Sequence, residues 1–228
     1  MLLGQQIYYY GKRESETVLI QMIERPFLRR MPLEIDYIKE FAGTDDFLLA
    51  GVRVSDWNED LTPWVAPGLF GKKDFSGLGP ESLDILLNVA IPAIQQEHPS
   101  DNIRLFLGGY SLSALFALWA AHKTDVFSGV AAASPSMWYP HFTEFMESNE
   151  IQTDAVYLSI GDKEEKIRNP VMKVVGDEIR KADQLLTDRG VYHTLEWNEG
   201  KHFADVEKRT AMGFAWLLKN RYLWTLLD

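Results

Sequence analysis

Hydrophobic and polar positions follow two patterns along the chain: short apolar runs, and longer segments with apolar residues three or four positions apart. Short apolar runs are typical of buried strands, whereas the three-to-four spacing is typical of helices that pack on one face. The runs predict strands over 7–10, 17–23, 47–54, 103–107, 128–133, 155–160 and 192–197, and the spacing predicts helices over 33–41, 80–98, 112–122, 172–189 and 204–220. Because strands and helices alternate, we expect an α/β domain with a mostly parallel sheet covered by helices on both faces.

No repeat, low-complexity run or linker interrupts this alternation, so residues 1–228 are predicted to form a single domain. The longest irregular stretch, 55–79, carries four large aromatic residues. Long loops in compact domains are usually functional or disordered, and large aromatic rings argue against disorder. We expect Trp57, which directly follows a strand end, to contact a substrate. The alternative is that the rings only attach the loop to the domain, and this alternative is stronger for Trp64, Phe70 and Phe75.

Composition narrows the functional classes. The chain is 46% hydrophobic with a net charge of −10, which favours a globular protein and disfavours nucleic acid or an anionic membrane as partner. It has no cysteine, so disulfides, thiolate nucleophiles and cysteine-bound metals are excluded. No run approaches the ~20 apolar residues of a membrane span, and the first residues do not resemble a secretory signal. We therefore expect a cytoplasmic protein. No metal-binding or phosphate-binding motif is present, so neither a metal nor another cofactor is expected.

The clearest candidate chemistry lies between the strand 103–107 and the helix 112–122. Ser111 stands there, with Gly109 two residues before it and Ser113 two residues after it. This is the spacing of a nucleophile elbow, a sharp strand-to-helix turn that projects one side chain above the sheet. Its strained backbone requires small neighbours, although the last position usually holds glycine rather than serine. These residues alone are equally consistent with a glycine-rich turn that has no catalytic role.

A nucleophilic serine needs a base, normally histidine, and a carboxylate to orient it. Of the five histidines, His202 lies between the last strand and the last helix, where a catalytic histidine belongs in the order Ser, acid, His. His98 and His122 lie near helix ends, where a cation suits the helix dipole, His193 lies within a strand, and His141 follows a surface-like segment. His202 is therefore the predicted base, and the alternative is a polar loop residue or helix cap.

The acid is expected in the loop Gly161-Asp162-Lys163-Glu164-Glu165, which follows a buried strand. Catalytic acids on such loops commonly lie a few residues past a glycine, which favours Glu164. Asp162 and Glu165 remain open, because neighbouring carboxylates in a charged loop often only face solvent. The oxyanion donors are expected to be the backbone N–H of Leu112, directly after the nucleophile, and one N–H from the turn at residues 22–24, for which we choose Ile23.

With these residues in place, the chain resembles α/β-hydrolases of the enterochelin-esterase-like group, and more closely its compact bacterial members without a cap. The resemblance lies in DWNEDLTPW, FLGGYSLSALFALWAA, SGVAAASPSMWYP, AVYLSIGDKEEKIRNPVM and LEWNEGKHF, and it covers most of the chain. It implies an α/β-hydrolase fold and maps Ser111, His202 and Glu164 onto the catalytic serine, histidine and acid, although some relatives rely on a Ser–His pair. It also implies that Trp138 lines the substrate pocket. The resemblance covers the hydrolase domain and not the N-terminal domain of full enterochelin esterases, so we do not expect their siderophore substrate to carry over.

The sequence thus predicts a serine hydrolase that cleaves a small-molecule carboxylic ester through an acyl-enzyme. The alternative is a non-catalytic ligand-binding or regulatory protein on a hydrolase scaffold, with the aromatic loop gripping the ligand. The order of serine, carboxylate and histidine favours the enzyme. Neither the physiological substrate nor the oligomeric state follows from the sequence.

Overall fold

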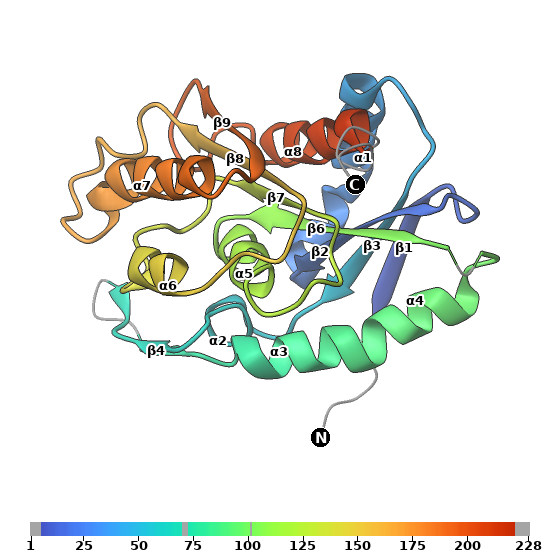
Figure 1. Ribbon diagram of the computed structural model, residues 1–228, viewed down its shortest axis with the longest axis horizontal. Coiled ribbons are helices and arrows are strands. Elements are labelled where there is room, and N and C mark those ends of the chain that lie inside the picture. Colours follow the sequence, from blue (N-terminus) through green and yellow to red (C-terminus); the bar gives the residue numbers. More distant parts are fainter. Residues whose placement is uncertain (1–5, 70–72, 101, 222–228) are drawn as a thin grey trace.

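A sheet forms the centre of the molecule, for which a computed structural model describes residues 6–69, 73–100 and 102–221. Within these ranges seven strands follow one another in the order β1-β3-β2-β6-β7-β8-β9 (Figure 1). Among these seven strands only β1 runs antiparallel to its neighbour, so the predicted mostly parallel sheet is confirmed. The strands are β1 (Ile7–Gly11), β2 (Thr17–Ile23), β3 (Leu48–Arg53), β6 (Arg104–Tyr110), β7 (Gly129–Ala133), β8 (Ala155–Gly161) and β9 (Tyr192–Asn198).

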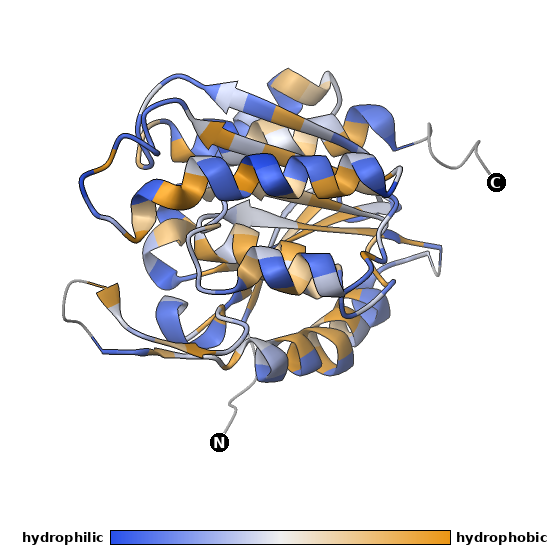
Figure 2. Cartoon of the chain, turned by 60° about the vertical axis from the view of Figure 1, so that its left-hand side comes forward, coloured by the Kyte–Doolittle hydropathy of each residue, from blue (hydrophilic) through white to orange (hydrophobic). Residues whose placement is uncertain are grey.

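Helices cover both faces of this sheet. On one face α8 packs across β6, β7 and β8 and against α1, while on the other α5 packs on β6 and β7, and α7 on β8 and β9. In Figure 2, hydrophobic and hydrophilic residues alternate along the helices that cover the sheet, as expected for helices with one buried side. The helices are α1 (Met31–Ala42), α3 (Gly79–Ile85), α4 (Ile91–Glu97), α5 (Leu112–Ala120), α6 (Phe142–Ser148), α7 (Val175–Asp188) and α8 (Val206–Asn220), with 3₁₀ turns at Arg25–Arg29 and Met172–Val174.

The mostly apolar sequence of β2 follows from this layering. All seven of its residues are buried. Ile20 packs into the cluster under α5, and its neighbour Leu19 packs into the cluster under α1 and α8. Successive side chains of a strand point to opposite faces, so a strand covered on both sides is buried at every position and mostly apolar, with Thr17 and Gln21 as buried polar residues of β2.

The strand before Ser111 is longer than predicted. Gly108 and Gly109 do not end it, because β6 continues to Tyr110. A Cβ on Gly108 would lie 2.7 Å from the Phe214 ring of α8, and one on Gly109 would lie 2.2 Å from Ser113 Oγ. The glycines therefore let helices approach both faces of the strand and do not act as strand breakers.

Two further elements differ from the prediction. The helix expected over 80–98 contains a π turn, Leu86–Ala90, between α3 and α4. This turn lies just before Pro92, whose ring and missing N–H are incompatible with regular α-helical hydrogen bonds. The segment that contains His141 is not all surface loop, since His141 directly precedes α6.

The irregular stretch contains the short helix α2 (Trp57–Asp60) and a two-stranded ribbon, β4 (Val65–Ala66) and β5 (Phe75–Ser76). The Trp64 ring lies against Tyr139, and the Phe75 ring lies 5.9 Å from that of Trp138. These two loop residues therefore hold the stretch on the body of the domain. Phe70 lies outside the described residues.

Candidate active site

Ser111 is held in a strained turn at the carboxyl end of β6. Its backbone has φ 58° and ψ −119°, a left-handed conformation that is costly for a residue with a side chain. It directly precedes α5, whose first N–H groups have no partner within the helix. This turn requires glycine at position 109, because any Cβ there would collide with Ser113. This is the backbone geometry of a nucleophile elbow.

The two expected oxyanion donors lie beside this turn. Leu112 is the first residue of α5, so its N–H lies at the positive end of the helix. Ser113 Oγ donates to the Met22 carbonyl over 2.9 Å, which fixes the end of β2 against the first turn of α5. Ile23 is the last residue of β2, and its carbonyl accepts from the Val54 N–H. Its side chain is buried on the opposite face of the sheet, so only its backbone can serve the site.

Three side chains that follow the carboxyl ends of β6, β8 and β9 form a hydrogen-bonded row. His202 Nε2 lies 3.0 Å from Ser111 Oγ, and His202 Nδ1 lies 2.6 Å from Glu164 Oε2. A carboxylate only accepts, so Nδ1 carries the proton and Nε2 presents its lone pair to the serine hydroxyl. The arrangement supplies a nucleophile, a base and an orienting acid in direct contact. His202 lies after β9 and Glu164 after β8, as the carboxyl ends of parallel strands require.

Glu164 is almost fully buried and is held in its ionised form. Burial raises the pKa of its carboxyl, but the hydrogen bond and charge of His202 together with the Gly161 N–H and the Ser134 hydroxyl outweigh burial and leave the pKa below its usual value. Oε1 accepts from the Gly161 N–H and from Ser134 Oγ, both over 2.8 Å. Ser134 itself has φ 43°, so its backbone is strained to place this donor.

Arg209 of α8 was not anticipated from the sequence. Its side chain is 2% exposed, and Nη1 lies 3.1 Å from Glu164 Oε1, so the acid is bonded to histidine on one oxygen and to a guanidinium on the other. The same guanidinium donates to the Glu199 carbonyl over 2.8 Å and to the Tyr110 hydroxyl over 3.2 Å. The Tyr110 hydroxyl donates in turn to the His202 carbonyl. One buried cation therefore contacts the acid, the start of the loop that carries the base and, through Tyr110, the carbonyl of the base itself.

The alternative acids lie elsewhere. Asp162 accepts from the Gly200 N–H over 2.7 Å, and Glu165 pairs with Arg180 of α7 over 2.9 Å. Of the three carboxylates that the sequence left open, Glu164 is the one that the structure brings to His202.

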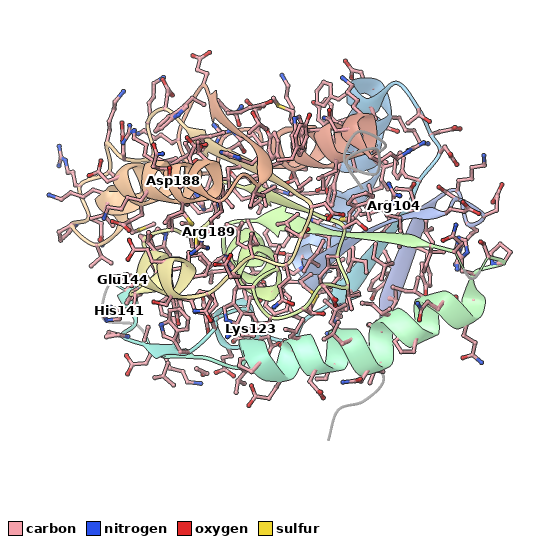
Figure 3. The ribbon with its side chains drawn as sticks, in the orientation of Figure 1. Arg104, Lys123, His141, Glu144, Asp188 and Arg189 are labelled. Carbon is pink, nitrogen blue, oxygen red and sulfur yellow. The ribbon has the colours of Figure 1, made fainter. Side chains whose placement is uncertain are left out.

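The other histidines have separate environments. His141 lies at the exposed start of α6, with Nδ1 3.8 Å from Glu144 Oε1 (Figure 3). His98 Nε2 lies 2.8 Å from the Ser15 carbonyl. His193 Nε2 lies 3.2 Å from Asp183. Burial lowers the pKa of His122 to about 4.

An open cavity of about 720 Å³ lies beside His202 and Glu164. This volume falls within the range of small-molecule sites. It is bounded by the loops after β7, β8 and β9 and by the start of α7. Trp138 lines it, as the resemblance implied, with Pro135, Lys163, Glu164, Lys166, Ile167, Arg168, Met172, Val175, Lys201, His202 and Phe203.

Trp57 does not line this cavity. Its ring stacks on Phe27 with centroids 5.3 Å apart, and the backbone N–H of Trp57 donates to Glu24 Oε1 over 2.6 Å. With Ile23 and Tyr110 it borders a separate space of about 20 Å³, which is about the size of one water molecule. Packing against Phe27 explains the position of the Trp57 ring, so the contact of Trp57 with a substrate stays a prediction.

Within residues 6–69, 73–100 and 102–221, no three His, Asp or Glu side chains gather in a way that could hold a metal ion. None of the helices in those ranges has the length and apolar character needed to cross a membrane.

Comparison with known proteins shows similarity in structure alone, since no protein-family model and no curated protein sequence matches the chain significantly. The siderophore hydrolase EstA from Aspergillus nidulans superposes with a TM-score of 0.66 at 18% identity, over 98% of this chain and 91% of EstA. An IroE-like serine hydrolase from Shewanella oneidensis gives 0.71 at 15% identity, over 98% of this chain and 77% of its own. The enterobactin esterase FES from Shigella flexneri gives 0.70 at 15% identity, with 98% of this chain covering 56% of FES.

These solved structures include a siderophore hydrolase and an enterobactin esterase, which fits the group that the sequence motifs resemble. At such identities the similarity shows a shared fold, and the predicted α/β-hydrolase fold is confirmed.

Proposed function

We propose that this protein hydrolyses carboxylic esters through an acyl-enzyme on Ser111. The observation that carries the proposal is the continuous row from Ser111 Oγ to His202 Nε2, 3.0 Å, and from His202 Nδ1 to Glu164 Oε2, 2.6 Å. Hydrolases and esterases share the fold, which supports ester hydrolysis in general.

The reaction follows from the positions of the donors and acceptors. As Ser111 Oγ attacks the ester carbonyl, its proton passes to His202 Nε2, and Glu164 stabilises the resulting imidazolium. The N–H groups of Leu112 and Ile23 hold the oxyanion. His202 then donates the proton to the departing alcohol, which leaves the acyl group on Ser111. A water molecule, deprotonated by His202, attacks this ester and releases the acid and the free serine.

Replacement of the nucleophile tests the proposal. Ser111→Ala should abolish turnover of short 4-nitrophenyl esters, with a loss of about 10⁶-fold in kcat if the three residues act as a unit. The matched control is Ser148→Ala, the same change at an exposed hydroxyl that bonds only the Glu144 carbonyl. Undiminished turnover by a folded Ser111→Ala protein would end the proposal.

A further inference from the structure

The mouth of the cavity beside His202 is lined by four cations. Lys163, Lys166 and Arg168 come from the loop after β8, and Lys201 comes from the loop after β9. We call these four side chains the cationic rim. Within the described residues, none of the four has a carboxylate within 4.0 Å, whereas other cations such as Arg180 and Lys181 pair with carboxylates on or next to α7. The rim is therefore positive charge that the fold does not neutralise.

The rim is positively charged although the whole chain has a net charge of −10. The carboxylates next to the rim do not offset it fully. Glu164 is engaged by Arg209 and His202, and Glu165 is engaged by Arg180. Asp162 is close enough for Lys163 and Lys166 to contribute to its lowered pKa, after the larger effect of the Gly200 N–H. Clefts lined by one sign of charge concentrate ligands of the opposite sign.

Behind the rim the cavity is apolar. Trp138, Met172 and Val175 line it and are less exposed than the four cations, and Ile167 lines it with 40% of its surface exposed. Phe203 is 86% exposed although its ring lies 5.0 Å from that of His202. A large ring next to the base and open to water is a surface that a bound apolar group would cover. The cavity thus offers an apolar wall and a positive mouth within reach of the same histidine.

From this combination we propose that the substrate is an amphipathic anionic ester, with an apolar part packed against Trp138, Met172 and Phe203 and an acidic group bound by the cationic rim. The inference rests on the proposed ester hydrolysis and adds its substrate class. A carboxylate can lie on the acyl side or on the alcohol side of the scissile bond, and matched esters distinguish the two.

The test compares anionic and neutral esters of equal length. On the acyl side, mono-4-nitrophenyl glutarate is compared with 4-nitrophenyl valerate. On the alcohol side, the butyrate of 5-hydroxy-2-nitrobenzoate is compared with 4-nitrophenyl butyrate. Each kcat/KM is divided by the rate of hydroxide-catalysed hydrolysis of the same ester. We expect the anionic ester of at least one pair to be favoured by about tenfold or more at low salt, with the preference shrinking as added salt screens the rim.

Charge reversal assigns the preference to the rim. Lys166→Glu combined with Arg168→Glu should lower the anionic-to-neutral ratio by about tenfold or more. The control combines Lys123→Glu with Lys219→Glu, which changes the net charge equally. Lys123 follows the end of α5 that lies away from Ser111, and Lys219 lies in the last turn of α8, away from Arg209.

The outcomes separate this inference from the proposed function. If neutral esters are turned over but no anionic ester is favoured, or if the preference survives reversal of the rim, the inference is wrong and the esterase proposal stands. If no ester of either kind is turned over by folded protein, the proposed function itself fails.

Discussion

The buried contact between Arg209 and Glu164 gives a prediction that joins stability to chemistry. Arg209→Met keeps much of the length of the side chain and removes its charge and donors. The wild-type guanidinium lies 3.1 Å from Glu164 Oε1, and the two side chains are 2% and 4% exposed. Removing one partner of such a pair leaves the other as an uncompensated buried charge, which typically costs about 3–5 kcal/mol. The Glu199 carbonyl and the Tyr110 hydroxyl lose a donor as well.

The expected change in Tm follows from this cost in free energy. In a chain of this size each kcal/mol corresponds to about 2–4 °C, so Arg209→Met should lower Tm by roughly 6–20 °C. The assay is thermal and urea unfolding of the wild type, Arg209→Met, Glu164→Gln and the double variant. If the pair is coupled, the double variant should lose less than the sum of the two single losses, by more than about 1 kcal/mol.

The acidic limb of the pH profile of kcat/KM gives a second measurement. Without the guanidinium, Glu164 carries a less compensated charge, which stabilises the imidazolium of His202. The acidic limb of kcat/KM should therefore move to higher pH in Arg209→Met, measured at a temperature where the variant is folded. Additive losses in the double-mutant cycle, or a destabilisation below about 1 kcal/mol, would refute the reasoning that the pair is buried and coupled.

Three further predictions concern other sites. Burial is the main cause that raises the pKa of Glu34 to about 8. The native state therefore keeps a proton that the unfolded chain releases near pH ~4.3. The free energy of unfolding should fall by about 5 kcal/mol as pH rises from ~4.3 to ~8. Glu34→Gln should abolish this decline in urea unfolding at pH 5 and pH 9, and a persistent decline would contradict it. Gly109→Ala places a Cβ 2.2 Å from Ser113 Oγ, so Tm should drop, with a cost of about 1–3 kcal/mol or more; an unchanged Tm would oppose the packing argument. Glu164→Gln should lower kcat by about 10⁴, whereas Glu165→Gln should barely change it, and equal losses would oppose the assignment of the acid.

Local patterns were enough to predict the fold. β2 is mostly apolar because helices cover both of its faces, and that pattern can be read without any long-range contact. Gly109 and Ser113 indicated the elbow because the tight turn excludes larger side chains. His202 could be chosen over the other histidines from its place between the last strand and the last helix.

What the sequence could not supply depends on contacts across the sheet. Arg209 is separated from Glu164 by 45 positions, and nothing local indicates that the two meet. One signal existed, since Arg209 is in phase with the buried positions Gly213 and Leu217 of α8, where a charged residue requires a buried partner. Ser134 gave no signal, because a serine in a motif does not reveal which carboxylate its hydroxyl will reach.

Covalent labelling of folded wild-type protein with a fluorophosphonate tests the central claim most directly. Such a reagent phosphonylates a serine whose hydroxyl is activated by a neighbouring base and whose oxyanion is held by donors. We predict one adduct per chain, mapped by peptide mass spectrometry to Ser111, absent in Ser111→Ala and strongly slowed in His202→Ala. Absence of an adduct at Ser111 in folded protein, or labelling of Ser111 that is as fast in His202→Ala as in the wild type, would contradict it and favour a ligand-binding protein on a hydrolase scaffold.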